Sequence, residues 1–161
     1  MTTTHPTLGE ARLPRNPLLS EVLALVSKQK TKAKKIQILK ENESLHLKSV
    51  LIWNFDESVK SMLPDGDVPF NKNEAPAGTE HTSLASEARK LYHFIVGGNN
   101  TINKLKKETM FIQMLEGLHA DDAEVLMAIK NKNLNNVYKG LTAQMVKETF
   151  GWNDDFVRIA Q

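Results

Sequence analysis

The sequence predicts an all-α fold, a compact bundle of about seven short helices. Apolar residues recur at three- and four-residue intervals along most of the chain, which is the spacing of one helix face. Strand signals are almost absent, because no run of β-branched residues alternates with polar ones and no Asn-Gly hairpin occurs. The 161 residues suit one domain with its own core. We therefore expect a single helical domain over residues 16–161, preceded by a flexible arm over residues 1–15.

Cap residues mark the first three predicted helices. Asn16 followed by Pro17 is a typical helix start, and the apolar stripe that follows predicts a helix over residues 17–28. Thr31 can cap a second, strongly basic helix, and Ser44 can cap a third. The first third of the domain is therefore expected to consist of three short helices.

The helical pattern breaks in the middle of the chain. Residues 55–63 can add a turn or a short helix. Residues 64–80 hold three prolines, two glycines and several small polar residues. This composition predicts an irregular loop or a flexible insertion that divides two helical clusters.

The second cluster begins at Ser83, which can cap the next helix. Gly97 and Gly98 are expected to end that helix in the left-handed conformation, which glycine adopts without a steric cost. A new helix is expected to start after Thr101.

Two further helices complete the prediction. Asp121 with Glu124 three residues later resembles a capping box. Thr142 can cap the last clear helix, which Gly151 is expected to close.

The sequence offers no pattern of an active site. It contains no cysteine, and its five histidines fall in unrelated segments without metal-ligand spacing. Glycine-rich phosphate loops and a nucleophile elbow are absent. We expect no enzyme, no catalytic residue, no metal and no cofactor, with an unrecognised hydrolase as the remaining alternative. No apolar run approaches the length of a signal peptide or a membrane span, so we expect a protein of the cell interior without a membrane partner.

Lysines gather at two places although the formal net charge is only +2. Lys30, Lys32 and Lys35 surround the start of the second predicted helix, and Lys104 follows the restart after Thr101. Lysines near phosphates release counterions and give salt-dependent affinity without base specificity. The alternative is a helix face that is merely solvated.

Two glycine-containing turns precede helices with lysines. Free amides and the positive end of the helix dipole make such a start an anion site, and glycine lets a phosphate approach the backbone. Each turn can equally be an ordinary helix stop and cap. The first turn comprises Gly98, Asn99, Asn100 and Thr101, and the second comprises Lys139, Gly140, Leu141 and Thr142.

Three segments resemble the N-terminal helical DNA-binding domain of ATP-dependent DNA ligases, especially those of T-even-type phages. "VLALVSKQKTKAKKIQILKEN" resembles its first two helices, and "IVGGNNTINKLKKETMFI" resembles the turn that meets DNA phosphates in those ligases. "DDAEVLMAIKNKNLNNVYKGLTAQMVKETFGW" is similar to the end of that domain. The resemblance covers roughly residues 20–152 and implies binding to the backbone of double-stranded DNA across a minor groove.

The chain departs from the ligase pattern at several positions. Gly97 and Gly98 stand where the family has threonine and glycine, Lys132 stands for its basic residue, and Asn133 for its aspartate. Backbone amides would still bind phosphate after these changes. Ligation would be lost, because Leu63 in "LPDG" occupies the place of the adenylylated lysine and the nucleotidyltransferase domain is not represented.

These observations predict a non-catalytic phage protein that binds double-stranded DNA, intact or nicked, as an accessory factor in phage DNA metabolism. Its expected location is the cytoplasm of the infected host cell. The alternative is a domain that kept the fold, lost DNA binding and now contacts a phage or host protein or belongs to the virion. Residues 1–15 and 64–80 would then be the natural contact regions.

Overall fold

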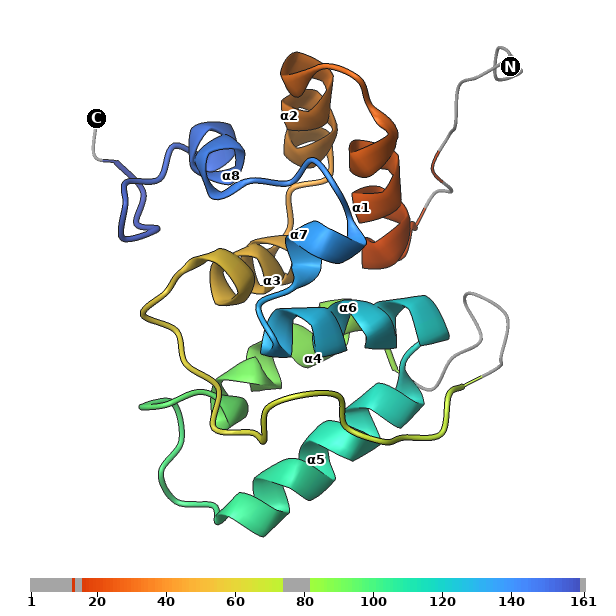
Figure 1. Cartoon of the computed structure of the whole chain (residues 1–161), viewed down its shortest axis with the longest axis vertical. Coiled ribbons are helices and arrows are strands. Elements are labelled where there is room, and N and C mark those ends of the chain that lie inside the picture. Colours follow the sequence, from red (N-terminus) through yellow and green to blue (C-terminus); the bar gives the residue numbers. More distant parts are fainter. Residues whose placement is uncertain (1–12, 14–15, 74–81, 160–161) are drawn as a thin grey trace.

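The computed structural model describes residues 13, 16–73 and 82–159. Within these ranges the chain forms eight α-helices and one 3₁₀ helix, and β-structure is limited to isolated bridges (Figure 1). The all-α prediction is confirmed. Most of the predicted arm over residues 1–15 and the second half of the predicted 64–80 loop lie outside the described residues.

The helices are short and follow one another closely along the chain. Their bounds are α1 (Leu19–Lys28), α2 (Lys32–Glu41), α3 (Leu45–Phe55), α4 (Leu84–Glu87), the 3₁₀ helix η1 (Ala88–Phe94), α5 (Lys104–Gly117), α6 (Ala120–Lys130), α7 (Leu134–Val137) and α8 (Ala143–Phe150).

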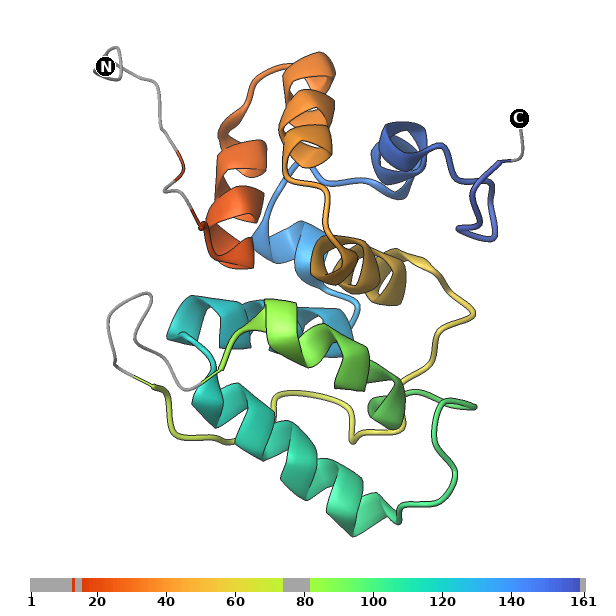
Figure 2. The same ribbon diagram turned by 180° about the vertical axis from the view of Figure 1, so that it is seen from behind.

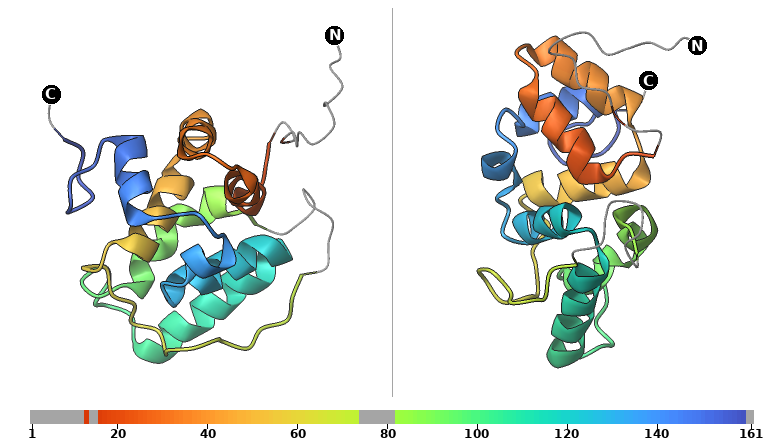
Figure 3. Two further views of the ribbon diagram at one scale, coloured as in Figure 1. Left: turned by 45° about the horizontal axis from the view of Figure 1, so that its top comes forward. Right: turned by 90° about the vertical axis from the view of Figure 1, so that its right-hand side faces the viewer.

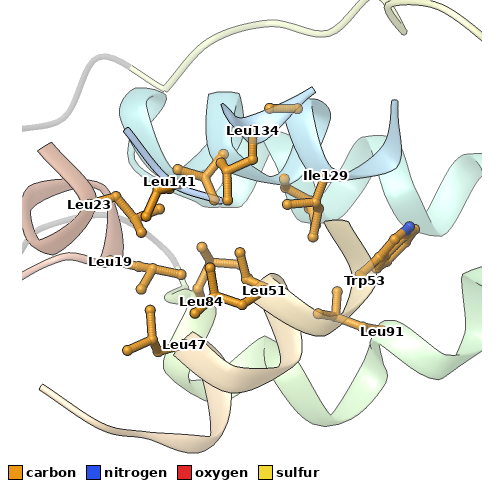
Figure 4. Packing of buried hydrophobic residues seen from close by; sticks show 14 of the residues in the cluster. Leu19, Leu23, Leu47, Leu51, Trp53, Leu84, Leu91, Ile129, Leu134 and Leu141 are labelled. Carbon is orange, nitrogen blue, oxygen red and sulfur yellow. The ribbon is translucent and has the colours of Figure 1, made fainter. Parts of the chain in front are cut away.

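The core lies around α3 and α6 in the middle of the molecule. Figure 1 shows α1, α2 and α8 above these two helices and α5 below them, and Figure 2 shows α4 beside α6 on the other side of the molecule. α6 is buried on most of its sides, as expected for a helix at the centre of a core. Side chains from above and below meet there, as Figure 4 shows for Leu23, Leu51, Leu91 and Ile129.

Four predicted caps are confirmed, because in each case a side-chain oxygen accepts a hydrogen bond from an amide three residues later. Such a contact satisfies an amide that the helix itself cannot pair. The pairs are Thr31 with Lys34 (3.2 Å), Ser44 with Leu47 (3.1 Å), Ser83 with Ser86 (3.2 Å) and Thr142 with Met145 (3.1 Å). Gly151 closes α8 in the left-handed conformation, as predicted.

The prediction that Pro17 opens the first helix is wrong. α1 begins at Leu19 with Leu18 as its N-cap. The amide of Ser20 donates to the carboxylate of the buried Asp122 in α6 at 2.9 Å, and the amide of Leu18 donates to Glu21 at 2.8 Å. The start of α1 is therefore fixed partly by a residue from a distant helix.

The start of α6 also differs from the prediction. His119, not Asp121, is the N-cap, and its Nδ1 accepts a hydrogen bond from the amide of Asp121 at 3.1 Å. Residues 56–63 form no helix, because this segment pairs with the chain after η1. The amide of Met62 donates to the carbonyl of Phe94 at 2.7 Å.

The described part of the 64–80 segment is an irregular loop packed on α5 and α6. The amide of Asn71 donates to Glu116 of α5 at 2.8 Å, and the amide of Val68 lies 3.4 Å from the sulfur of Met127 in α6. Lys130 donates to the carbonyl of Pro64 at 2.6 Å. These contacts hold residues 64–73 against the helices.

Candidate nucleic-acid interface

Two parts of the chain that are distant in the sequence meet here, the connection from α1 to α2 and the turn that leads into α8. The hydroxyl of Ser27 at the end of α1 donates to the carbonyl of Lys139 at 2.7 Å. The side chain of Lys35 lies directly over Gly140. Figures 1 and 2 show the turn between α7 and α8 running beside α1 and α2. We call this region the basic corner, defined by Ser27, Lys30, Lys35 and residues 139–142.

Glycine at position 140 has a clear structural reason. Its φ of +93° lies in the left-handed region, where other residues are strained. A Cβ atom there would also lie 2.2 Å from Nζ of Lys35. The absence of a side chain at Gly140 therefore lets the ammonium group of Lys35 sit on the backbone of the turn.

The amides of the turn are available to a ligand. Within the described part of the chain, no hydrogen bond is donated by the backbone N–H groups of Lys139, Gly140 and Thr142, and residues 139 and 140 form a turn. Leu141 is only 3% exposed and belongs to the core, so this predicted site residue is not accessible to a ligand. The hydroxyl of Thr142 is occupied in capping α8. The turn thus offers backbone donors rather than side-chain donors.

The lysines of the basic corner differ in their partners. Lys32 pairs with Glu148 of α8, so its charge is largely neutralised. Lys30, Lys35 and Lys139 form no salt bridge with any carboxylate among the described residues. Lys30, Lys35 and Lys139 therefore keep uncompensated positive charge, and of these Lys35 lies against the turn at Gly140.

The first predicted turn, residues 98–101, has a different construction. α5 begins at Lys104 with Asn103 as its N-cap, so the prediction that Thr101 starts this helix is wrong. The carbonyl oxygen of the Asn99 side chain accepts from both the amide (2.9 Å) and the hydroxyl (2.7 Å) of Thr101. This closed local turn competes with helix formation at Thr101.

The residues around Gly98 are held by packing. A Cβ atom at Gly98 would lie 1.9 Å from the carbonyl oxygen of Tyr92, so only glycine fits. Gly97 has the predicted left-handed conformation, with a φ of +85°. The same prediction is wrong for Gly98, whose φ is not positive, and the preceding helix ends earlier, at Phe94. The amide nitrogen of the Asn99 side chain contacts Nδ1 of His93 at 2.8 Å. These glycines therefore have a structural explanation that needs no ligand.

The two predicted turns do not form one surface. The start of α5 lies at the lower end of the molecule in Figure 1, whereas α2 and α8 lie at the upper end. Lys104 is exposed and without a salt bridge among the described residues, and Asn100 is exposed as well. The fold joins the α2 lysines to the second turn only.

Lys132, which the ligase resemblance aligns with a basic residue, is part of the framework. Its ammonium group donates to the carbonyls of Trp53 (2.6 Å) and Asp56 (2.8 Å) at the end of α3. Burial lowers the pKa of Lys132, while the nearby carboxylate of Asp56 opposes this shift. The sequence alone gave no sign of this role, because the carbonyls come from a segment more than seventy residues earlier.

No metal centre or membrane span emerges from the structure. In the described ranges, no three histidine, aspartate or glutamate side chains lie close enough together to hold a metal ion. None of the helices that the structure describes is long and apolar enough to cross a bilayer.

Comparisons with known proteins give one match. The model of a family of unknown function, DUF6433, matches residues 22–136, which is well over half of the chain. No curated protein and no solved structure matches. The comparisons do not link the chain to ligase DNA-binding domains, so that resemblance stays a prediction.

Proposed function

We propose that this chain, which belongs to the family of unknown function DUF6433, binds the phosphate backbone of double-stranded DNA at the basic corner without performing catalysis. The observation that carries the proposal is the position of Lys35 over Gly140, beside amides that donate no hydrogen bond within the described residues. Backbone donors and an adjacent cation are the groups that bind phosphate at helix starts.

The chemistry of the corner favours the DNA backbone over the bases. Amides and lysines recognise phosphate oxygens, which carry no sequence information. No arginine, glutamine or asparagine side chain belongs to the basic corner as defined, and these side chains make most base-specific contacts. The proposed binding is therefore independent of sequence and strongly dependent on salt.

The resemblance to ligase DNA-binding domains suggests the process in which the proposed DNA binding takes part. A domain that binds DNA as the ligase domain does would serve as an accessory factor in phage DNA metabolism, in the cytoplasm of the infected cell. A preference for nicked duplex would follow from the same resemblance.

The test is fluorescence anisotropy of the full chain with labelled duplexes, one intact and one nicked, over a series of salt concentrations. The proposal predicts that log affinity falls linearly with log salt, with a slope of about −0.9 per phosphate contact. Tighter binding to the nicked duplex would indicate a ligase-like mode. Absence of binding at low salt would refute the proposed function.

A second candidate function, contact with a phage or host protein, rests on the opposite end of the molecule. Val96 is 61% exposed and Leu105 is 73% exposed, which is unusual for large apolar side chains. The exposed Tyr92 and Met62 lie in the same region, because Met62 pairs with the chain after η1. Exposed apolar side chains of this kind suit a protein partner, including a component of the virion.

This candidate makes a different prediction from DNA binding. A complex purified from infected cells should be lost when Val96 and Leu105 are both replaced by serine and should survive loss of the lysines of the basic corner. A complex that survives the serine substitutions would exclude this surface as the contact.

A further inference from the structure

A cavity of about 250 Å³ lies between the end of α2, the start of α3 and the chain around the end of α8. Figure 3 (left) shows α8 beside α2, with the segment after α8 turning at the edge of the molecule. Neither the proposed DNA contact nor the protein contact uses this cavity. Its lining includes Lys40, Glu43, Lys48, Phe150, Trp152 and Arg158, and we call it the C-terminal cavity.

The aromatic wall of the C-terminal cavity is a pair of packed rings. The ring centroids of Phe150 and Trp152 are 4.8 Å apart with an interplanar angle of 34°. Trp152 is only partly buried, so part of its indole can contact a ligand. A flat ring can stack on such a side chain, and nucleobases are the common biological ligands that do so.

A short turn brings a cation to this wall. Residues Trp152 and Arg158 form an antiparallel bridge, and the amide of Ile159 donates to the carbonyl of Gly151 at 2.8 Å. Side chains of directly paired residues lie on the same face of a bridge. The side chain of Arg158 therefore leaves the backbone on the face that carries the indole, and it lines the cavity.

The cations of the C-terminal cavity outnumber its acids. Lys48 pairs with Glu43 and also lies 5.7 Å from the centre of the Phe150 ring, so its charge is compensated. Lys40 and Arg158 form no salt bridge with any carboxylate that the structure describes. Two uncompensated cations beside aromatic rings suit an anion that also carries a planar ring.

We propose that the C-terminal cavity binds a nucleoside phosphate unit, with the base on Trp152 and the phosphate between Lys40 and Arg158. The cavity volume lies just below the usual range for small-molecule sites, about 300–1,000 Å³, which fits one nucleotide unit rather than a larger ligand. The unit can be a free nucleotide or the phosphorylated end of a single strand, because both present the same groups. This inference does not depend on the proposed binding of double-stranded DNA.

The test is isothermal titration calorimetry of the full chain with thymidine 5′-monophosphate. Thymidine and inorganic phosphate, titrated separately, report the contributions of the base and of the anion. We expect thymidine and inorganic phosphate each to bind at least about tenfold more weakly than the nucleotide, because thymidine lacks the phosphate contact and phosphate lacks the stacked base. No binding of the nucleotide, or equal binding of nucleotide and phosphate, would overturn the proposal.

Matched variants locate the binding. Lys40→Gln and Arg158→Gln each remove one exposed cation and should lower nucleotide affinity at least about fivefold. Trp152→Leu should have an effect of about the same size through lost stacking. Lys34→Gln is the control, because Lys34 is an exposed α2 lysine outside the cavity lining. An equal loss in the Lys34 control would show diffuse charge attraction and overturn the site.

A second titration separates the two sources of the ligand. A short single-stranded thymidine oligonucleotide with a 5′-phosphate should bind at least as tightly as the mononucleotide if strand ends are the natural ligand. Weaker binding of the oligonucleotide would assign the cavity to free nucleotides. With either ligand, Arg158→Gln must weaken the binding for the result to support the nucleoside phosphate site. Unchanged affinity of the Arg158→Gln variant would contradict the site.

Discussion

The turns before α5 and α8 have similar sequences and different structures. In both, a glycine, a threonine and nearby lysines precede a helix. Before α5, the amide of Thr101 donates to Asn99 and the amide of Gly98 donates to Ile95, so the turn satisfies part of its own backbone. Before α8, the amides of Lys139, Gly140 and Thr142 donate no hydrogen bond within the described chain, and the side chain of Lys35 reaches the turn from another helix. The sequence pattern of a glycine followed by a cap residue therefore does not show whether the amides of the turn are hydrogen-bonded within the turn.

The surroundings of the two turns differ as well. The turn before α5 lies near the exposed apolar side chains of Val96 and Leu105. The turn before α8 lies among lysines without acidic partners. The two ends of the molecule thus suit different partners, an apolar protein surface and a polyanion, and the variants below separate them.

Matched charge reversals at the two turns should have the largest effect. Lys35→Glu with Lys139→Glu should lower duplex affinity about 50-fold at 0.1 M salt, because two phosphate contacts are lost. The salt slope should fall by about 2. Lys104→Glu with Lys106→Glu changes the net charge equally and should have a clearly smaller effect, measured by the same anisotropy titration. Equal losses would mean that only net charge matters.

Lys132→Met should lower stability without changing DNA binding. The substitution removes hydrogen bonds from a charged donor to the carbonyls of Trp53 and Asp56 at the end of α3. The free energy of unfolding should fall by about 2 kcal/mol, as measured by urea denaturation. Lys106→Met is the control, since Lys106 is exposed and should leave stability unchanged. A loss of affinity in folded Lys132→Met would indicate that Lys132 contacts DNA.

Gly140→Ala and Gly97→Ala form a closely matched pair. Both residues have a left-handed φ, so each substitution should cost about 1 kcal/mol in stability. Only the Cβ atom at position 140 meets Lys35, whereas the corresponding atom at Gly97 has nothing within 4 Å. Duplex affinity should therefore fall a few-fold, about the value of a single weakened phosphate contact, in Gly140→Ala alone. An unchanged affinity there would remove Lys35 from the proposed contact.

Replacement of His46 should have the smallest effect. It should change how stability depends on pH, and it should affect neither turn. Burial lowers the pKa of His46 from its ordinary value of 6.5, although the carboxylate of Asp122 opposes this shift. The unfolded chain therefore binds this proton more readily, and stability should fall as the pH drops through the ordinary value. Comparing thermal unfolding of the wild type and His46→Gln at about pH 7.5 and about pH 5 should show a smaller decrease in the variant. An equal decrease in both proteins would contradict this role of His46.

The sequence by itself determined most of the helices and the starts of four of them. Helix periodicity and helix caps depend on contacts between residues three or four positions apart, so they can be predicted from local sequence. The caps predicted in this way are Thr31, Ser44, Ser83 and Thr142. The predictions failed where a competing contact was stronger. The side chain of Asn99 accepts a hydrogen bond from the amide of Thr101, so Thr101 lies in a turn and α5 begins at Lys104 instead.

Only the tertiary structure decided which of these local features share a surface. Ser20 and Asp122 are 102 positions apart, and Ser27 and Lys139 are 112 positions apart, yet each pair is hydrogen-bonded. Local propensities carry no information on such pairs, because packing of the buried helix faces brings the segments together. The sequence could therefore identify both the lysines and the turns. Packing of the core placed Lys35 against Gly140, and it placed the turn before α5 at the other end of the molecule.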